Sequence, residues 1–318
     1  MSSPRRIATV FGATGQQGGS VITALLADGI FTPRAVTRSA SSPAAQALRD
    51  RGCEVVEANL GDREAVRRAV EGAECVFGVT VPFTPIPEMQ QGRNMVDAAK
   101  EAGVKFFVWS SLPSVKQISG GKYTKVAHFD DKAEIQKYLQ ASGIPHANIL
   151  TGFFLENFVS NMMSLTPTPT GGYELKTPVS PAAINTVCWI GREMGSAVAA
   201  LMRGYADNKL DETNGQEYIL GSGTATFPEI LGEFEKVLGK PVTLTQIPNL
   251  GIPALDEMFD FTAEYDRYAG RPRQYDRYAG RPRPDPRLLA LGAKVGSVRE
   301  FAQEVLKPYL EGKAQEAK

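Results

Sequence analysis

The chain has few of the residues that build disulfide frameworks or metal sites. Its 318 residues include three cysteines, Cys53, Cys75 and Cys188, and two histidines. The cysteines are odd in number, widely spaced and form no C-x-x-C pair, so neither a disulfide framework nor a structural zinc site is indicated. We therefore expect no metal ion and a reduced, cytoplasmic protein, with a nuclear location also open.

Long apolar runs and an excess of charge of either sign are also lacking. No apolar run approaches the 18 residues or more of a membrane-spanning helix, and the first apolar run ends at Gly12, too early for a signal peptide. Lysine and arginine number 35, and aspartate and glutamate also number 35. This balance argues against general attraction to membranes or nucleic acid, so we expect no membrane partner and no direct nucleic-acid binding.

Short β-rich runs alternate with helical patterns from Arg6 to Gly152. The expected strands lie at 6–12, 33–38, 53–60, 74–81, 105–111 and 146–152, and the expected helices at 18–29, 44–52, 62–72, 95–103 and 128–143. Strict alternation of this kind requires right-handed crossovers between parallel strands. The sequence therefore predicts an α/β fold with a Rossmann-type, doubly wound parallel sheet.

After Phe158 the pattern changes. We expect a loop with a hairpin at 165–181, strands at 216–223 and 241–248, and helices at 190–204 and at 226–239, where Thr226 is the N-cap. These pieces are too few for an independent domain. We expect residues 1–158 to form the Rossmann domain and residues 159–318 to form a smaller α+β lobe on the carboxyl ends of its strands.

A glycine-rich loop lies between the first expected strand and the first expected helix. Its spacing is Gly12-x-x-Gly15-x-x-Gly18, with Thr14, Gln16 and Gln17 in between. Glycines there let the backbone approach a ligand, and free N–H groups at the helix start bind an anion such as a pyrophosphate. We favour dinucleotide binding over a purely structural turn, because strand, loop and helix follow in the required order.

The end of the second expected strand indicates which dinucleotide is bound. An NAD site places an acidic residue there for the ribose 2′-hydroxyl, whereas an NADP site places a cation for the 2′-phosphate. This strand ends in Arg38, followed by serines. A solvated surface arginine is the alternative. We interpret Arg38 as a 2′-phosphate ligand and expect NADP(H) as the cofactor.

Several segments together resemble the NmrA-like family, an atypical branch of the short-chain dehydrogenases that includes NADP(H)-responsive redox sensors and regulators. The segments are "VFGATGQQGGSV", "VTR", "QGRNMVDAAKEAGVKFFVWSSL", "HFDDKAEIQKYL", "FFLENF" and "GSGTATFPEI". The resemblance implies a dinucleotide along Gly12–Gly18, with Arg38 on the 2′-phosphate and Lys132 near the nicotinamide ribose. It places Asn59 and Leu60 by the adenine. It also implies that Thr80, Val81 and Pro82, at the end of the fourth strand, bind the cofactor. Phe154, Leu155, Glu156 and Asn157 are expected to close over the nicotinamide end.

The chain departs from the family pattern at three places. Asn59 stands where the family often has aspartate, and Trp189 replaces the aspartate of a D-I-G element. The segment "YDRYAGRPR" occurs twice, at 265–273 and 275–283, where relatives have one Y-x-x-R-P element. The last two departures concern the substrate side rather than the cofactor site. We expect the arginine- and tyrosine-rich region at 264–287 to be a surface loop or a contact for a partner protein rather than a nucleic-acid site.

The tyrosine of the dehydrogenase Y-x-x-x-K pair is replaced by His128, four residues before Lys132. His128 is a candidate proton donor or only a helix-start residue, and Lys132 is expected to bind cofactor. The Y-x-x-x-K at Tyr205 and Lys209 lies too late in the chain to be catalytic. The hydroxyls of Ser110 and Ser111 are active-site or loop-capping groups. Apolar candidates for the cleft, each of which is alternatively a core residue, are Phe83, Trp109, Phe153, Phe154, Phe158 and Met162.

Of two functions of different class, we favour the first and keep the second as the alternative. In the first, dinucleotide binding shifts the conformation of a redox sensor or its association with a regulatory protein. In the second, the protein is an NADPH-dependent reductase of a small, apolar carbonyl, quinone or enone. We expect any reduction to be slow or confined to activated acceptors that need little acid catalysis. A homodimer is open under either function.

Overall fold

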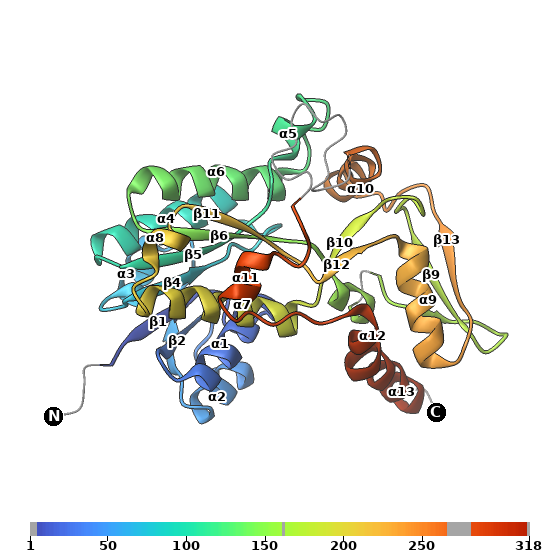
Figure 1. Cartoon of the computed structure of the whole chain (residues 1–318), viewed down its shortest axis with the longest axis horizontal. Coiled ribbons are helices and arrows are strands. Elements are labelled where there is room, and N and C mark those ends of the chain that lie inside the picture. Colours follow the sequence, from blue (N-terminus) through green and yellow to red (C-terminus); the bar gives the residue numbers. More distant parts are fainter. Residues whose placement is uncertain (1–4, 161–162, 266–280, 317–318) are drawn as a thin grey trace.

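The computed structural model describes residues 5–160, 163–265 and 281–316. Seven parallel strands form its main sheet in the order β11-β6-β5-β4-β1-β2-β3. Figure 1 shows the carboxyl ends of these strands directed toward a smaller lobe. The strands are β1 (Ile7–Val10), β2 (Thr32–Thr37), β3 (Glu54–Glu57), β4 (Cys75–Gly78), β5 (Phe106–Ser111), β6 (His146–Thr151) and β11 (Gln216–Leu220).

The strand order of the main sheet reverses between β1 and β4. From β1 the chain runs outward through β2 and β3 on one side, and from β4 through β5 and β6 on the other. β1 pairs in parallel with both β2 and β4. Open α/β sheets bind ligands outside the carboxyl ends of the strands at such a reversal. The predicted doubly wound sheet is confirmed, and its reversal point lies beside the glycine loop.

Helices cover both faces of the sheet (Figure 1). Their sequences carry clear start signals: Ser42 caps α2 and Asp62 caps α3 by accepting a hydrogen bond from the third helical N–H. One face is covered by α1 (Gln16–Asp28), α2 (Pro43–Asp50) and α7 (Ile190–Ala206), and the other by α3 (Arg63–Val70), α4 (Glu88–Glu101) and α6 (Ala127–Ser142).

Two of these elements come from the second half of the chain. β11 pairs in parallel with β6 at the edge of the main sheet, and α7 packs against α1. Ser20 of α1 joins the two helices, because its hydroxyl donates to the Gly191 carbonyl at 3.0 Å and accepts from the Gly195 N–H at 2.9 Å. Residues on both sides of position 158 therefore build the larger unit. The division into domains at that position stays a prediction.

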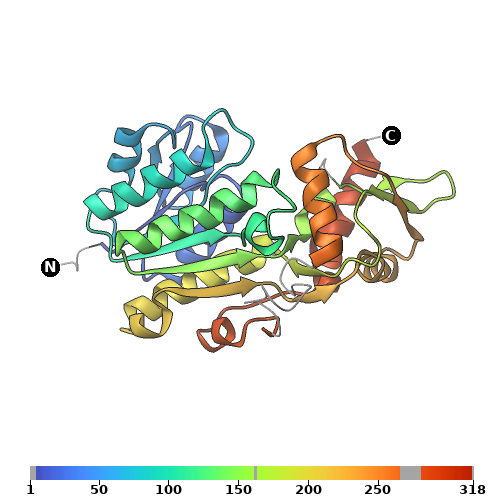
Figure 2. The ribbon, with the colours of Figure 1, turned by 90° about the horizontal axis from the view of Figure 1, so that it is seen from above.

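The smaller lobe contains two three-stranded sheets, in the orders β12-β10-β7 and β13-β9-β8. β8 and β9 form the expected hairpin, and Thr226 with Glu229 forms a capping box at the start of α9. Figure 2 shows the lobe beside the main sheet along the long axis. Its elements are β7 (Phe153–Phe154), η1 (Leu155–Val159), β8 (Thr166–Pro167), β9 (Tyr173–Thr177), β10 (Asn185–Cys188), β12 (Gly223–Ala225), α9 (Phe227–Leu238), β13 (Val242–Gln246), α10 (Pro253–Tyr265), α12 (Val298–Phe301), η3 (Ala302–Leu306) and α13 (Lys307–Glu316).

Aromatic side chains fill the core of the lobe. The Phe158 ring lies 5.5 Å from that of Phe153, 5.8 Å from that of Phe227 and 5.0 Å from that of Phe234. Phe158 is fully buried here, and Trp109 is fully buried in the core between the main sheet and its helices. Of the two alternatives for these residues, the structure selects the core, because packing within the cores takes up both side chains.

Three short helices, α5 (Val115–Ile118), α8 (Leu210–Thr213) and α11 (Pro286–Ala290), complete the described elements. Met162, and residues 266–280 of the region that carries the duplicated segment, lie outside the described residues. Within the described ranges, no helix has both the length and the apolar character needed to cross a membrane.

Candidate functional site

The glycine loop follows β1 and ends at the first turn of α1. Gly12 has φ of +62°, a left-handed conformation that favours glycine. A Cβ atom on Gly18 would lie 2.3 Å from the Gly12 carbonyl oxygen, so only glycine fits there. No described side chain caps the start of α1, where Gly15 is the N-cap. This close-packed turn with uncapped helical N–H groups fits a dinucleotide pyrophosphate.

Arg38 lies directly after β2, at the same edge of the sheet. Its side chain is exposed, and its guanidinium forms no hydrogen bond or ion pair within the described residues. The loop that follows it is well fixed: Ser42 caps α2, and the Ala40 N–H donates to Glu57 Oε2 at 2.7 Å. A fixed loop carrying an available cation suits a phosphate group.

We expect Arg38→Ala to weaken NADPH binding far more than NADH binding. Loss of one charge-assisted contact to the 2′-phosphate costs on the order of 1.5–3 kcal/mol, or about ten- to a hundredfold in affinity. NADH lacks that phosphate and serves as the internal control. Calorimetric titration of both dinucleotides is the measurement, and an equal loss for the two contradicts the assignment of Arg38.

Asn59 and Leu60 follow β3, where the resemblance places the adenine. Asn59 is exposed, and its Oδ1 accepts a hydrogen bond from the Gly61 N–H at 3.0 Å. The Leu60 carbonyl accepts from Asn94 Nδ2 of α4 at 2.8 Å. These contacts fix the loop after β3, and the adenine contact stays a prediction.

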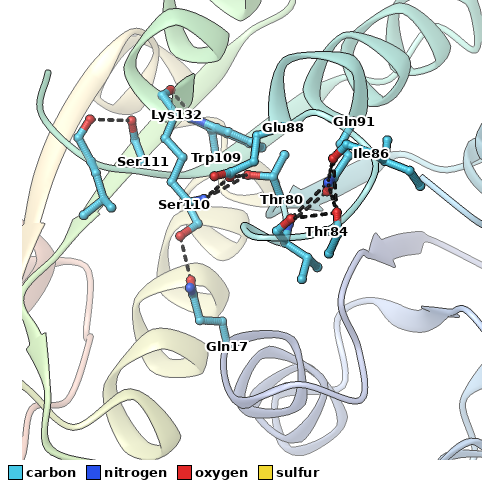
Figure 3. A network of polar contacts seen from close by, with 12 residues as sticks. Gln17, Thr80, Thr84, Ile86, Glu88, Gln91, Trp109, Ser110, Ser111 and Lys132 are labelled. Atoms are coloured by element: carbon cyan, nitrogen blue, oxygen red, sulfur yellow. Dashed lines mark hydrogen bonds and ion pairs between the residues drawn. The ribbon is translucent and has the colours of Figure 1, made fainter. Parts of the chain in front are cut away.

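The loop between β4 and α4 contains Thr80, Val81 and Pro82. Gln91 of α4 clamps this loop: its Oε1 accepts from the Val81 N–H at 2.9 Å, and its Nε2 donates to the carbonyls of Val81 and Ile86 at 3.0 and 2.9 Å (Figure 3). Gln91 is 1% exposed. Sequence reasoning missed this residue. A glutamine in the first turn of a helix that follows a proline-rich loop is a recognisable candidate for hydrogen bonds to the backbone of that loop.

Lys132 of α6 extends toward the start of α4. Its ammonium group forms a buried ion pair with Glu88 and donates to Thr80 Oγ1 at 3.0 Å. The Thr80 hydroxyl in turn donates to Glu88 Oε2 at 2.5 Å (Figure 3). Burial lowers the pKa of Lys132 below its usual value, and the charge of Glu88 opposes that shift. Glu88 is a site residue that the sequence did not single out.

Ser110 and Ser111 end β5, and their hydroxyls form hydrogen bonds on opposite faces of the sheet. The Ser110 hydroxyl donates to Gln17 Oε1 at 2.6 Å, which ties β5 to the first turn of α1 (Figure 3). The Ser111 hydroxyl donates to Gln136 Oε1 at 2.6 Å, inside the layer between sheet and helix. Ser110 therefore belongs to the site, whereas Ser111 has a structural contact.

A cavity of about 290 Å³ lies where these groups meet the smaller lobe. Its floor is polar and comes from the Rossmann side, with Gln17, Thr80, Ser110 and Lys132. Most of its other lining side chains are apolar or aromatic: Pro82, Phe83, Leu112, Phe129, Phe153, Phe154, Met163, Leu255, Met258 and Phe259. An apolar cavity with a few convergent polar groups is typical of a small-molecule site.

α10 forms the wall contributed by the lobe. Its residues Leu255, Met258 and Phe259 line the cavity. Two acidic residues fix α10 to the loop before α6: Glu257 Oε1 accepts from the Lys125 N–H at 2.6 Å, and Glu264 pairs with Lys122. This wall could not be predicted from the sequence, because α10 begins about a hundred residues after Phe154 and meets the earlier lining residues only through the fold.

Only part of the segment that was predicted to close over the nicotinamide reaches the cavity. Phe154 and Asn157 line the cavity, whereas Leu155 is fully buried in the core of the lobe. The carboxylate of Glu156 accepts from the N–H groups of Ile190 and Gly191, at 3.2 and 2.7 Å. Glu156 thus caps α7, whose own N-cap residue Trp189 forms no side-chain cap hydrogen bond within the described residues.

His128 lies in the first turn of α6 and lines the same cavity as Lys132. Its ring is 5.2 Å from that of Phe83, which is 68% exposed, and 5.0 Å from that of Phe129. The Tyr205 hydroxyl instead bonds Glu74 at 2.9 Å, and neither Tyr205 nor Lys209 lines the cavity. The structure therefore brings together His128 and Lys132 and not the later Y-x-x-x-K pair.

The NmrA-like family matches residues 4–267. The NmrA-like family domain-containing oxidoreductase FrzB of Cladobotryum sp. is 31% identical over 284 residues, with 80% of this chain and 83% of FrzB covered.

Solved structures agree on the fold. NmrA, a negative transcriptional regulator, has been solved with NAD, with a TM-score of 0.82, 19% identity and 98% of each chain covered, and also with NADP. The NADPH-dependent quinone oxidoreductase QOR2 of Escherichia coli, solved with NADPH, has a TM-score of 0.67 at 23% identity, with 94% of this chain and 99% of QOR2 covered. The resemblance drawn from the sequence is confirmed.

Proposed function

The chain belongs to the NmrA-like family, and from this premise we propose that it binds NADP(H) and reduces a small, apolar, conjugated carbonyl, quinone or enone. The observation that supports reduction is the cavity of about 290 Å³, whose polar floor adjoins the glycine-loop helix and whose apolar lining comes from both the Rossmann side and the lobe. When bound, NADPH supplies the hydride. Curated relatives named as oxidoreductases agree with this class of reaction.

The residues of the chain have distinct roles in this proposal. The glycine loop binds the pyrophosphate, Arg38 binds the 2′-phosphate and Lys132 binds the hydroxyls of the nicotinamide ribose. The Lys132 ammonium also stabilises negative charge that develops on the acceptor oxygen, because a fixed cation acts strongly where water is excluded. The aromatic wall of Phe153, Phe154 and Phe259 excludes that water and contacts a flat apolar acceptor.

His128 is the candidate proton donor at this cavity. Its imidazole lines the cavity and can donate a proton to a bound acceptor. Reduction of activated acceptors, whose anionic products are stable, needs little help from an acid. We therefore expect His128→Ala to keep NADPH affinity and to slow the reduction of simple carbonyls more than that of quinones.

The test is NADPH oxidation by purified protein with quinone and enone acceptors, followed at 340 nm. We expect turnover at an ordinary rate, above about 1 per second. Met258→Trp, which fills the cavity from α10, is expected to raise KM about tenfold while the Kd of NADPH stays unchanged, because a pocket that admits one group less loses about 1–3 kcal/mol. Asp260→Ala, at an exposed position of the same helix, is the matched control.

A redox sensor is the second candidate function. It is favoured by the likeness to NmrA, a negative transcriptional regulator, over 98% of both chains. In that case dinucleotide binding shifts the protein toward a partner-binding state without hydride transfer. Tight NADPH binding with no oxidation by any conjugated acceptor supports the sensor and contradicts the reductase.

A further inference from the structure

A buried carboxylate lies behind Lys132. The side chains of Glu88 and Lys132 are 6% and 7% exposed and form an ion pair. Thr80 closes the group, since its hydroxyl accepts from the ammonium at 3.0 Å and donates to Glu88 Oε2 at 2.5 Å. Figure 3 shows the three side chains converging between α6, α4 and the end of β4.

We propose that Glu88 is a positioning residue, which keeps the Lys132 side chain in its ammonium form and holds it at the wall of the cavity. The inference rests on the proposed function for the role of Lys132 but concerns a different residue. Lys132 and Thr80 line the cavity, and Glu88 does not. Glu88 therefore acts on a ligand through Lys132 rather than by contact.

An ammonium at this depth needs a neighbouring negative charge. Desolvation favours the neutral amine, and an opposite charge within hydrogen-bond distance restores the charged form. The titratable groups around Lys132 in the described residues are Glu88 on α4 and His128 and Asp131 on α6. The loop at 79–87 and β5 contain none. Glu88 is the carboxylate that contacts the ammonium directly.

The first turn of α4 fixes the geometry. Glu88 is the first residue of the helix, where the helix dipole stabilises a carboxylate. Three residues later, in the same turn, Gln91 binds the loop that contains Val81 and Ile86. The same turn therefore orients the lysine and fixes the loop that borders the cavity. Glu88→Gln retains Gln91 and the length of the side chain at position 88, so we expect it to keep this scaffold in place.

The test is a direct titration of Lys132 in the full chain, with 13C-labelled lysine observed by NMR and the Lys132 signal assigned from Lys132→Met. We expect Glu88→Gln to lower the pKa of Lys132 by at least about one pH unit, a tenfold change in proton affinity. Glu88→Asp keeps a carboxylate on a shorter arm and is expected to titrate between the wild type and Glu88→Gln. Thr80→Val removes a hydroxyl but no charge and is expected to shift less than Glu88→Gln.

Unchanged titration of Lys132 in Glu88→Gln overturns the proposal. If Glu88→Gln does not fold, Glu88→Asp decides, and a wild-type titration there overturns the proposal equally. This measurement needs neither dinucleotide nor turnover, so a failure of the proposed reductase function is seen separately, as absent NADPH oxidation by the wild type.

A second readout links Glu88 to the site. In Glu88→Gln, the affinity for NADPH is expected to fall on the alkaline side at a lower pH than in the wild type, following the lowered pKa of Lys132. A purely structural role of Glu88 weakens binding equally at every pH. A uniform loss across the pH range therefore contradicts the positioning role.

Discussion

Replacement of Lys132 with methionine is expected to lower kcat/KM for quinone reduction by about 10²- to 10³-fold, the effect of removing one preorganised charge from a site that excludes water. NADPH affinity is expected to fall as well, by about tenfold, through loss of the contact to the ribose. Methionine retains the length of the side chain and removes the charge. Steady-state kinetics and calorimetric titration measure the two effects separately.

The control for Lys132→Met concerns the charge that it leaves behind. Glu88 becomes a buried carboxylate without its partner, which destabilises the fold by about 3–5 kcal/mol. The double variant Lys132→Met with Glu88→Gln is expected to regain much of that stability, measured by urea unfolding, without regaining turnover. Recovery of turnover in the double variant contradicts a direct role for Lys132.

Replacement of Gly18 with alanine is expected to abolish tight dinucleotide binding. The new Cβ atom would lie 2.3 Å from the carbonyl oxygen and 2.5 Å from the carbonyl carbon of Gly12. Both are backbone atoms, so the loop itself has to move. Overpacking of this kind costs about 1–3 kcal/mol or more, which corresponds to a loss of about ten- to a hundredfold or more in affinity.

Gly19→Ala is the matched control on the same helix. A Cβ atom there would lie 3.6 Å from the Ala13 carbonyl oxygen, an ordinary contact. Alanine also has a higher helix propensity than glycine, by up to about 1 kcal/mol. We expect Gly19→Ala to bind NADPH like the wild type and to unfold at an equal or higher temperature. An equal loss of NADPH affinity in both variants contradicts the clash with Gly12 as the cause of the loss.

Sequence patterns identified the main sheet well because each signal is local. β5 reads as the apolar run "FFVWSS", all of it buried, and α9 begins at the capping box of Thr226 and Glu229. The glycine spacing predicted the close turn between β1 and α1. Within the first 158 residues, consecutive strands of the main sheet are adjacent in the sheet at every step except from β3 to β4, so alternation was enough to predict the layers.

Long-range pairing could not be predicted in this way. A helix at 190–204 and a strand at 216–223 were expected in a separate lobe, but α7 packs on α1 and β11 joins β6. Their sequence patterns fit the lobe and the main sheet equally well. The pattern of an amphipathic helix or an apolar strand indicates which face is buried, but not which other element packs against that face. Glu156 is a similar case, since its role as the cap of α7 depends on two segments that meet only in the folded chain.

By itself the sequence determined the succession of strands β1 to β6 with the longer helices between them, the turn at Gly12–Gly18, the cation at Arg38 and the membership in the family. These depend on periodicity, conformational preference and residue type, which act over a few residues. Only the tertiary structure decided which groups share the cavity: Glu88 behind Lys132, Ser110 against Gln17, and Met258 on α10. Such contacts join positions far apart in the chain, and their energies arise from burial and charge pairing that exist only after folding.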